Sequence, residues 1–151
     1  MRKPPFMLSS AALLLASSPA LAGPCPATRA EGVALLMTLP RLGDDICFYP
    51  CQRAYKYDAN KTTMFGVQPM SISSHSWGKQ LMSVEYLLPG SIGNYLSRYR
   101  KAFPNPYCDS DGRYCSFSVK GGAEGMLQQV ELIPDKTGNN TRLNCNFYFA
   151  D

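Results

Sequence analysis

Six cysteines have the clearest chemistry in this 151-residue chain: Cys25, Cys47, Cys51, Cys108, Cys115 and Cys145. The spacing of Cys47 and Cys51 matches neither the C-x-x-C redox motif nor a paired zinc motif, so we expect a structural disulfide there. Cys108 and Cys115 bracket a segment whose Asp-Gly pair favours a tight turn, and a bond that closes this loop is the best single prediction. A bond between Cys115 and Cys145 is the main rival, because both side chains are expected on inward strand faces. Six cysteines allow fifteen pairings, and spacing does not choose among them.

His75 is the single histidine of the chain, and it lies between serines in Ser73-Ser74-His75-Ser76. A histidine beside a serine is the arrangement of a general base next to a nucleophile, with Asp44 or Asp45 available to orient the ring. The chain has no Gly-x-Ser-x-Gly elbow, however, and adjacent serines are common in loops. We therefore predict a protein that is not an enzyme and has no cofactor, and we keep a small hydrolase using His75 as a third functional hypothesis.

The oxygen-rich segment Asp109-Ser110-Asp111-Gly112 has some features of a calcium-binding loop. A calcium loop of the EF-hand type needs several more ligands, including a terminal glutamate. Arg113 follows the segment, and its positive charge opposes cation binding. The segment is predicted to form an exposed turn, and no metal site is expected.

Tyrosine is abundant, with nine in the chain, and an aromatic cluster occupies residues 48–57. Tyrosine combines a large apolar face with a polar tip, so it is frequent where a protein contacts another protein or a sugar. The cluster predicts a recognition surface, although core packing explains many tyrosines equally well. The candidate binding residues in it are Tyr49, Tyr55 and Tyr57, next to Phe48.

Two further segments carry candidate binding residues. Arg98 and Lys101 fall near the end of a predicted helix, where they could form a small anion-facing patch, although a solvated helix end is the commoner explanation. The glycine-rich segment 121–125 is a candidate for insertion into a partner, with Glu124 at its tip.

The second half of the chain predicts a strand, a helix and three strands. Met82, Val84, Tyr86 and Leu88 share one face of the first strand, which Pro89-Gly90 ends. Ser91 is placed as the N-cap of an amphipathic helix that ends before Pro104. The three strands lie near 115–119, 130–132 and 143–149. The apolar face of the helix consists of Ile92, Tyr95, Leu96, Tyr99 and Phe103.

The first half is more irregular. Thr28-Arg29-Ala30-Glu31 has the form of a capping box and predicts a short helix ending before Pro40, with a buried strand over 33–39 as the alternative. Short strands are expected near 63–67 and 70–73. The fold class is therefore α+β: a small, disulfide-stabilised single domain in which one amphipathic helix packs on an antiparallel β-sheet.

The first 22 residues have the pattern of a cleaved secretory signal peptide. Arg2 and Lys3 precede an apolar stretch, and Ala20-Leu21-Ala22 supplies the small-residue cleavage pattern. We expect residues 23–151 to form the mature domain, periplasmic or secreted and without a membrane anchor. An even number of cysteines in an exported chain predicts a disulfide framework. The formal net charge of the whole chain is only +4, which does not favour a nucleic-acid partner.

Three functional hypotheses remain from the sequence. The first is a binding protein that acts on another protein in the cell envelope or outside the cell, as an inhibitor or an immunity protein. Such a role needs only a rigid surface that fills a cleft. The alternative is an envelope factor that binds glycan or assists the assembly of a surface structure. The third is the hydrolase described above.

Overall fold

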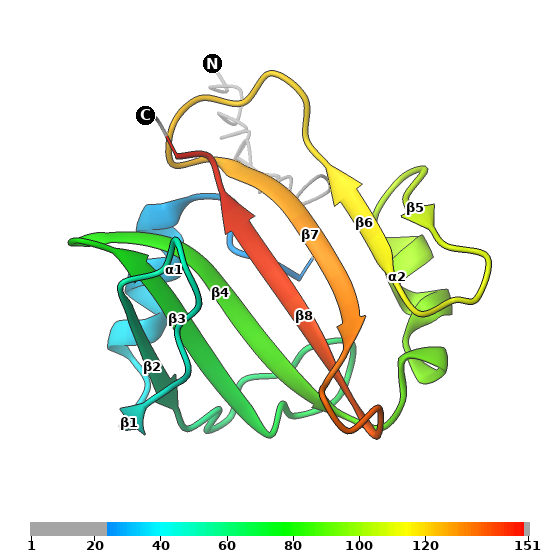
Figure 1. Cartoon of the computed structure of the whole chain (residues 1–151), viewed down its shortest axis with the longest axis horizontal. Coiled ribbons are helices and arrows are strands. Elements are labelled where there is room, and N and C mark those ends of the chain that lie inside the picture. The colour runs from blue at the N-terminus through cyan, green and yellow to red at the C-terminus, as the bar shows by residue number, and fades with distance from the viewer. Residues whose placement is uncertain (1–23, 150–151) are drawn as a thin grey trace, which may run out of the picture.

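The computed structural model describes residues 24–149, and their strands form one antiparallel sheet (Figure 1). Its eight strands lie in the order β1-β2-β3-β4-β8-β7-β6-β5. The predicted antiparallel sheet is therefore confirmed, and it is larger than the sequence indicated. The strands are β1 (Arg41–Asp44), β2 (Arg53–Tyr57), β3 (Ser71–Trp77), β4 (Gln80–Pro89), β5 (Tyr107–Cys108), β6 (Cys115–Ser118), β7 (Leu127–Pro134) and β8 (Asn140–Phe147).

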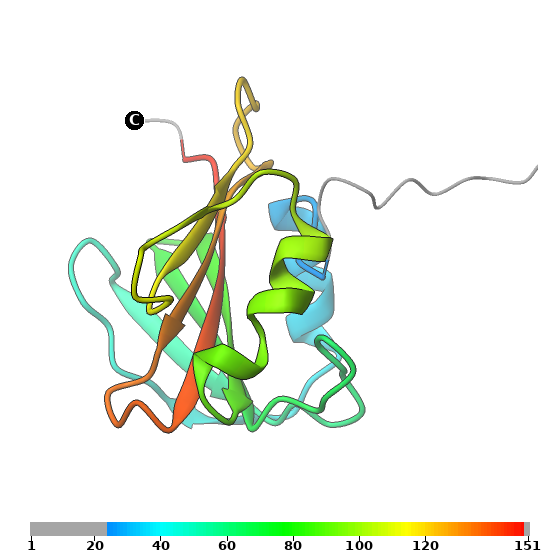
Figure 2. The same ribbon diagram turned by 90° about the vertical axis from the view of Figure 1, so that its right-hand side faces the viewer.

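Two α-helices, α1 (Arg29–Met37) and α2 (Leu96–Ala102), lie on the same side of this sheet. Figure 2 shows both helices on one side and the segment between β1 and β2 on the other. We call the covered side the helix face and the opposite side the open face. The prediction of one packed helix is corrected to two, because a sheet of this width has more apolar surface than one short helix covers.

Helix α1 begins where the capping residues predict it. The Thr28 side chain accepts a hydrogen bond from the Glu31 N–H at 3.2 Å. This N-cap satisfies one of the free amide groups of the first turn, so the helix prevails over the alternative strand at 33–39. Gly32 lets the helix approach the sheet closely, since a Cβ there would lie 3.1 Å from the side chains of both Leu81 and Phe147.

The helix predicted from Ser91 to Phe103 is divided in two. Ile92–Asn94 forms a 3-10 turn, η1, and α2 begins only at Leu96; the Ser91 side chain makes no capping hydrogen bond. The apolar face survives the division, because Tyr95 and Tyr99 are both buried. The Tyr95 hydroxyl donates to the Pro89 carbonyl, and the Tyr99 hydroxyl donates to the Val130 carbonyl at 2.6 Å.

A register irregularity changes the facing of one predicted core residue. The pairing of β3 with β4 shifts between His75 and Ser76. As a result Leu81 is buried on the helix face, while Met82 lies on the open face. The expectation that Met82 shares a face with Val84 is therefore wrong, since the bulge inverts the alternation at this point.

The two predicted strands of the first half fare differently. Residues 63–67 form a turn closed by an isolated bridge between Met64 and Val67, rather than a strand. The expected strand at 70–73 is the first part of β3, which continues to Trp77.

All six cysteines are paired. Cys47–Cys51 and Cys108–Cys115 are bonded as predicted. The third bond joins Cys25 to Cys145 across 120 residues, so the rival pairing of Cys115 with Cys145 is wrong. Three disulfides are consistent with an oxidising, extracellular environment. The predicted signal peptide, residues 1–22, lies outside the described residues.

Neither helix among residues 24–149 is long and apolar enough to cross a membrane.

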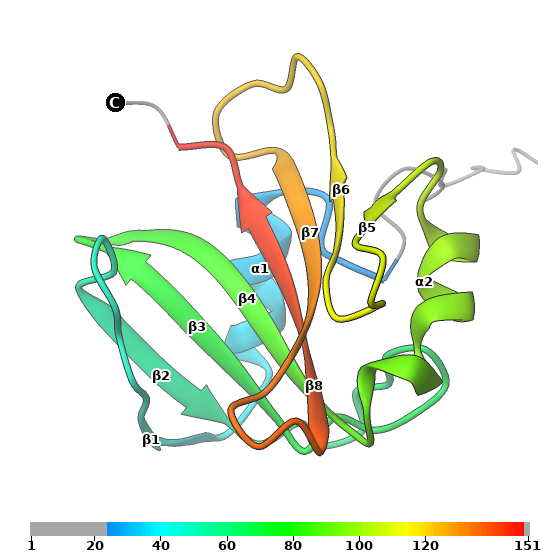
Figure 3. The same cartoon turned by 45° about the vertical axis from the view of Figure 1, so that its right-hand side comes forward.

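Figure 3 shows α2 beside the β5–β6 edge of the sheet, with α1 behind β4 and β8. Both helices therefore lie against the same side of the sheet, which leaves the opposite side free of helices.

Candidate functional site

The open face carries rows of polar side chains that strand register places side by side. Ser73 of β3 pairs with Glu85 of β4, and Glu85 pairs with Asn144 of β8. Asn144 in turn pairs with Glu131 of β7. In β8 the alternation buries Leu143 and Cys145 on the helix face and turns the residues between them to the open face. A continuous polar band thus crosses four strands.

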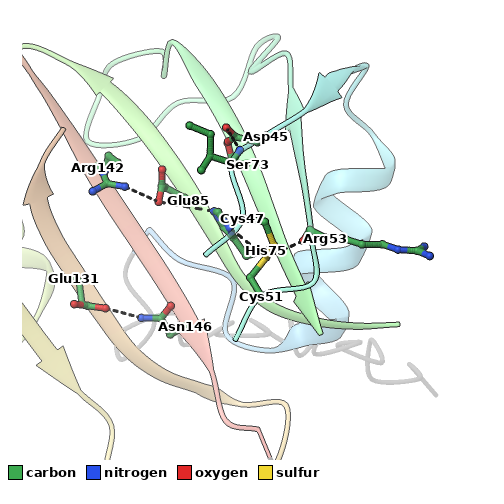
Figure 4. A network of polar contacts seen from close by, with 11 residues as sticks. Asp45, Cys47, Cys51, Arg53, Ser73, His75, Glu85, Glu131, Arg142 and Asn146 are labelled. Atoms are coloured by element: carbon green, nitrogen blue, oxygen red, sulfur yellow. Dashed lines mark hydrogen bonds and ion pairs between the residues drawn. A yellow bond between two sulfur atoms is a disulfide. The ribbon is translucent and has the colours of Figure 1, made fainter. Parts of the chain in front are cut away.

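At the centre of the band lies a cluster of charged and polar groups, which we call the polar cluster: Asp45, Ser73, His75, Glu85 and Arg142 (Figure 4). Glu85 Oε2 lies 3.7 Å from Arg142 Nη1 and 3.9 Å from His75 Nε2. The Ser73 hydroxyl donates to Asp45 Oδ2 at 2.5 Å. The side chains of His75 and Glu85 are mostly buried, so these contacts lie in a less polar environment than water.

Burial shifts the pKa values of the central groups. Desolvation lowers the pKa of His75, and Arg142 lowers it further, against an opposing effect of Asp45. Desolvation raises the pKa of Glu85, an effect that Arg142 partly offsets. Burial alone would raise the pKa of Asp45, but hydrogen bonds from Ser73 and from the Ile46 N–H outweigh it and lower the pKa. His75 is consequently neutral at pH 7, so its contact with Glu85 is polar rather than an ion pair.

Residues 45–52, between β1 and β2, extend over the open face beside this cluster; we call them the 45–52 loop. The Cys47–Cys51 bond closes it, and the Cys51 N–H donates to the Phe48 carbonyl at 2.8 Å. Cys51 Sγ lies 3.9 Å from His75 Nδ1, so the loop contacts the polar cluster directly. Gln52 N–H donates to the Ser76 carbonyl, which holds the end of the loop against β3.

Aromatic side chains gather where this loop meets the end of the β3–β4 hairpin. The Tyr49 side chain is 91% exposed, and its ring meets the Trp77 ring edge-on with centroids 6.3 Å apart. Phe48 is 66% exposed, and Phe149 lines the same groove as Tyr49 and Trp77. We call Phe48, Tyr49, Trp77 and Phe149 the aromatic patch.

Two clefts flank the line from His75 through Glu85 to Arg142. One, of about 320 Å³, extends toward Asp45 and the cations Lys56 and Lys136. The other, of about 390 Å³, extends toward the amide side chains of β7 and β8 and toward Phe149. Both volumes fall within the range of roughly 300–1,000 Å³ typical of small-molecule sites.

The structure divides the predicted aromatic cluster between the two faces. Tyr49 lies in the aromatic patch on the open-face side. Tyr55 and Tyr57 line a groove with Leu36 of α1, and Tyr57 is only 8% exposed. The Arg41 guanidinium lies 3.9 Å from the centre of the Tyr55 ring. The structure therefore does not bring the three tyrosines together on one surface.

The charged candidates lie away from the polar cluster. Arg98 and Lys101 are exposed on α2, and Arg98 Nη1 donates to the Phe65 carbonyl at 2.6 Å. Glu124 forms an ion pair with Arg29 at 3.3 Å, which links its loop to the start of α1. Arg29 also donates to the Tyr148 carbonyl, so the loop is attached to the body of the domain beside the end of β8.

The serine, histidine and acidic side chains of the polar cluster do not form the hydrogen bonds of a serine-hydrolase triad. The Ser73 hydroxyl donates to Asp45, while His75 faces Glu85 on one ring nitrogen and Cys51 Sγ on the other. A triad needs the histidine to accept the proton of the nucleophile. The geometry brings the expected residue types together without that contact.

Several residues of the site were not identified from the sequence. Glu85 of β4 and the β8 residues Arg142, Asn144 and Asn146 are not among the candidates that residue type and spacing single out. The available signal was their alternation, which put all three β8 residues on one face. Because the neighbour of β8 was unknown, the sequence did not place Glu85 beside them.

Within residues 24–149, the histidine, cysteine and acidic side chains form no group of three that could hold a metal ion. The Asp109 carboxylate caps its turn by accepting hydrogen bonds from the N–H groups of Arg113 and Tyr114.

Comparisons with protein-family models, with curated proteins and with solved structures gave no significant match to this chain.

Proposed function

We propose that this chain is an exported, non-catalytic binding protein that acts on another protein, as an inhibitor or immunity protein does. The partner lies in the cell envelope or outside the cell. The observation that carries the proposal is the aromatic patch, in which a nearly fully exposed tyrosine is held against a tryptophan by a disulfide-closed loop.

The composition of the patch supports binding to a protein. Tryptophan and tyrosine are enriched among the residues that dominate interface energies, and methionine is enriched at interfaces generally. Tyr49, Trp77 and Phe149 share their groove with Met82 and Lys79. Exposed aromatic groups that are grouped in this way mark interaction sites more often than scattered ones do.

The fixed shape of the loop supports tight binding. Ordering a flexible loop on association costs free energy, and a loop that is already ordered avoids much of that cost. The Cys47–Cys51 bond, the backbone bond within the loop and the attachment to β3 provide such order. An inhibitor that occupies a partner's surface needs this rigidity and no proton transfer.

The test compares single alanine variants in binding to a captured partner. Tyr49→Ala and Trp77→Ala should each weaken binding by about 2 kcal/mol, or roughly thirtyfold in Kd. The loss should appear mainly as faster dissociation, since interface substitutions act largely on the dissociation rate. Circular dichroism should show an unchanged fold.

Tyr107→Ala is the matched control. Tyr107 is 64% exposed, but it lies on β5 at the far edge of the sheet from β1. Its removal should leave the affinity unchanged. If His75→Gln abolished function while the Tyr49 and Trp77 variants bound normally, the hydrolase hypothesis would replace this one.

A further inference from the structure

The larger of the two clefts beside the polar cluster has a feature that protein docking on the aromatic patch does not use. Three buried side-chain atoms there have no hydrogen-bond partner within the described residues: His75 Nε2, Arg142 Nε and Asn144 Oδ1. All three residues line the cleft of about 390 Å³. Buried polar atoms are normally paired, so three unpaired ones just beneath the surface of a single cleft mark it as a place where small side-chain movements around a ligand would gain hydrogen bonds.

The charges of this cleft already compensate each other. Glu85 is paired with Arg142, and His75 is neutral at pH 7. Among the described residues Glu85 is the one carboxylate that lines the cleft, and the nearby Glu131, outside the lining, accepts a hydrogen bond from Asn146 Nδ2 at 2.9 Å. An added charge would therefore meet no free partner of opposite sign, and the complementary ligand is neutral.

The remaining polar groups of the cleft are amides and a hydroxyl. Gln129, Asn144, Asn146 and Ser83 line it from β7, β8 and β4. Each of these side chains both donates and accepts hydrogen bonds. A ligand that matches them must carry several groups with the same dual capacity, as the hydroxyl groups of a sugar do.

The cleft also has apolar walls. Phe48 and Pro50 of the 45–52 loop line it, together with Met82 and Phe149. A sugar ring presents C–H groups on its faces and hydroxyl groups around its edge. Aromatic side chains can pack against the C–H faces of the sugar, and amide side chains can hydrogen-bond to its hydroxyl groups. The apolar and polar linings of the cleft therefore match the two kinds of surface of one sugar ring.

We propose that this cleft is a binding subsite for a neutral saccharide, with one sugar ring between the 45–52 loop and the amides of β7 and β8. The glycan considered from the sequence thereby acquires a site other than the tyrosine cluster. Phe48 and Phe149 line this cleft and also belong to the aromatic patch, but the inference can be tested separately from the protein-binding proposal, because Asn144 lies outside the patch and Tyr49 and Trp77 lie outside the cleft.

The experiment titrates the mature protein with four defined trisaccharides and measures the binding of each by ligand-observed NMR. Triacetylchitotriose and maltotriose are neutral, the galacturonic acid trimer is anionic and the glucosamine trimer is cationic. At least one neutral trisaccharide should bind with a Kd of about 1 mM or tighter, and both charged ones at least about tenfold more weakly. Absence of binding of both neutral probes at about 10 mM would overturn the proposal, as would equal binding of a charged probe.

Two variants assign the binding to this cleft. Asn144→Leu replaces the hydrogen-bonding amide with an apolar side chain of similar volume and should weaken saccharide binding about tenfold. Gln129→Ala, at another position that lines the cleft, provides the same test if Asn144→Leu folds poorly. Asn139→Leu, in the exposed β7–β8 turn, is the control and should bind normally. Unchanged affinity in both cleft variants would refute the assignment.

Failure of this inference is distinguishable from failure of the proposed function. Asn144→Leu should still bind the protein partner through the aromatic patch, and Tyr49→Ala should still bind the trisaccharide. If no saccharide binds while Tyr49→Ala loses the protein partner, only the saccharide subsite is wrong. If the reverse pattern is found, only the protein-binding proposal is wrong.

Discussion

The two faces of the sheet use the same strands for different purposes. On the helix face, Tyr99 and Phe103 are fully buried, and the Tyr99 hydroxyl has a backbone partner. On the open face, the side chains of His75 and Arg142 keep 20% and 32% of their surface exposed, yet they include buried atoms without partners. Stability calls for satisfied, close-packed groups, whereas binding leaves groups ready for a ligand. The comparison indicates that the helix face maintains the fold, and it supports the proposal that the open face carries the recognition.

The disulfides show the same division. Cys25–Cys145 joins segments 120 residues apart beneath the helix face, whereas Cys47–Cys51 spans only four residues and closes the 45–52 loop. A bond that closes a long loop restricts the unfolded chain far more than a short one. The first bond therefore supports global stability, and the second mainly fixes the shape of the 45–52 loop.

Removal of each bond tests this division. In the chain-entropy model, replacing Cys25 and Cys145 with alanine should lower the free energy of unfolding by about 5 kcal/mol, against about 2 kcal/mol for Cys47 and Cys51. Urea denaturation measures both values. The loop variant should instead lose affinity for the protein partner. Equal destabilisation by the two changes would break the distinction.

A matched pair of phenylalanines tests the packing of the two faces. Phe103 is buried and its ring centre lies 4.9 Å from that of Tyr99 and 5.1 Å from that of Phe117. Phe103→Ala should cost about 3–5 kcal/mol, because it leaves a cavity in the core. Phe48→Ala, at an exposed position, should change stability by less than about 0.5 kcal/mol. Similar costs in urea denaturation would mean that the open face is packed like the core.

The smallest expected effect concerns acid stability. Burial lowers the pKa of His75, so the unfolded chain binds a proton more readily than the folded one. The contribution of neutral His75 to the free energy of unfolding is fully present above pH about 6.5, the pKa of histidine in the unfolded chain. It is lost as the pH falls through the lower pKa of His75 in the folded chain. Glu85, with its raised pKa, acts in the opposite direction and remains in both proteins compared. Between about pH 7.5 and 5.5 the Tm should fall more in the wild type than in His75→Gln, and parallel falls would contradict the burial of a neutral histidine.

Local signals predicted much of the fold. The short disulfides follow from cysteines that bracket tight loops, and α1 follows from a capping residue with its partner three positions later. The expected inward facing of Cys145 on the last strand is likewise confirmed, since this residue is buried in β8. Each of these depends on neighbours along the chain, which the sequence displays directly.

The rest depends on neighbours that are distant in sequence. Nothing near Cys25 indicates that its partner is Cys145, and nothing near Glu85 indicates that Arg142 lies beside it. The bulge at His75 inverted the facing of Met82, because one extra residue in a strand shifts the alternation. The site is assembled by strand order, which local patterns do not encode.

The central claim is that the aromatic patch on the open-face side recognises a protein. The most direct measurement is quantitative capture from an envelope extract by three immobilised proteins: the wild type, the double variant Tyr49→Ala with Trp77→Ala, and Tyr107→Ala. At least one protein should be retained by the wild type and by Tyr107→Ala and lost with the double variant. The same retained proteins, in the same amounts, on all three would contradict the account.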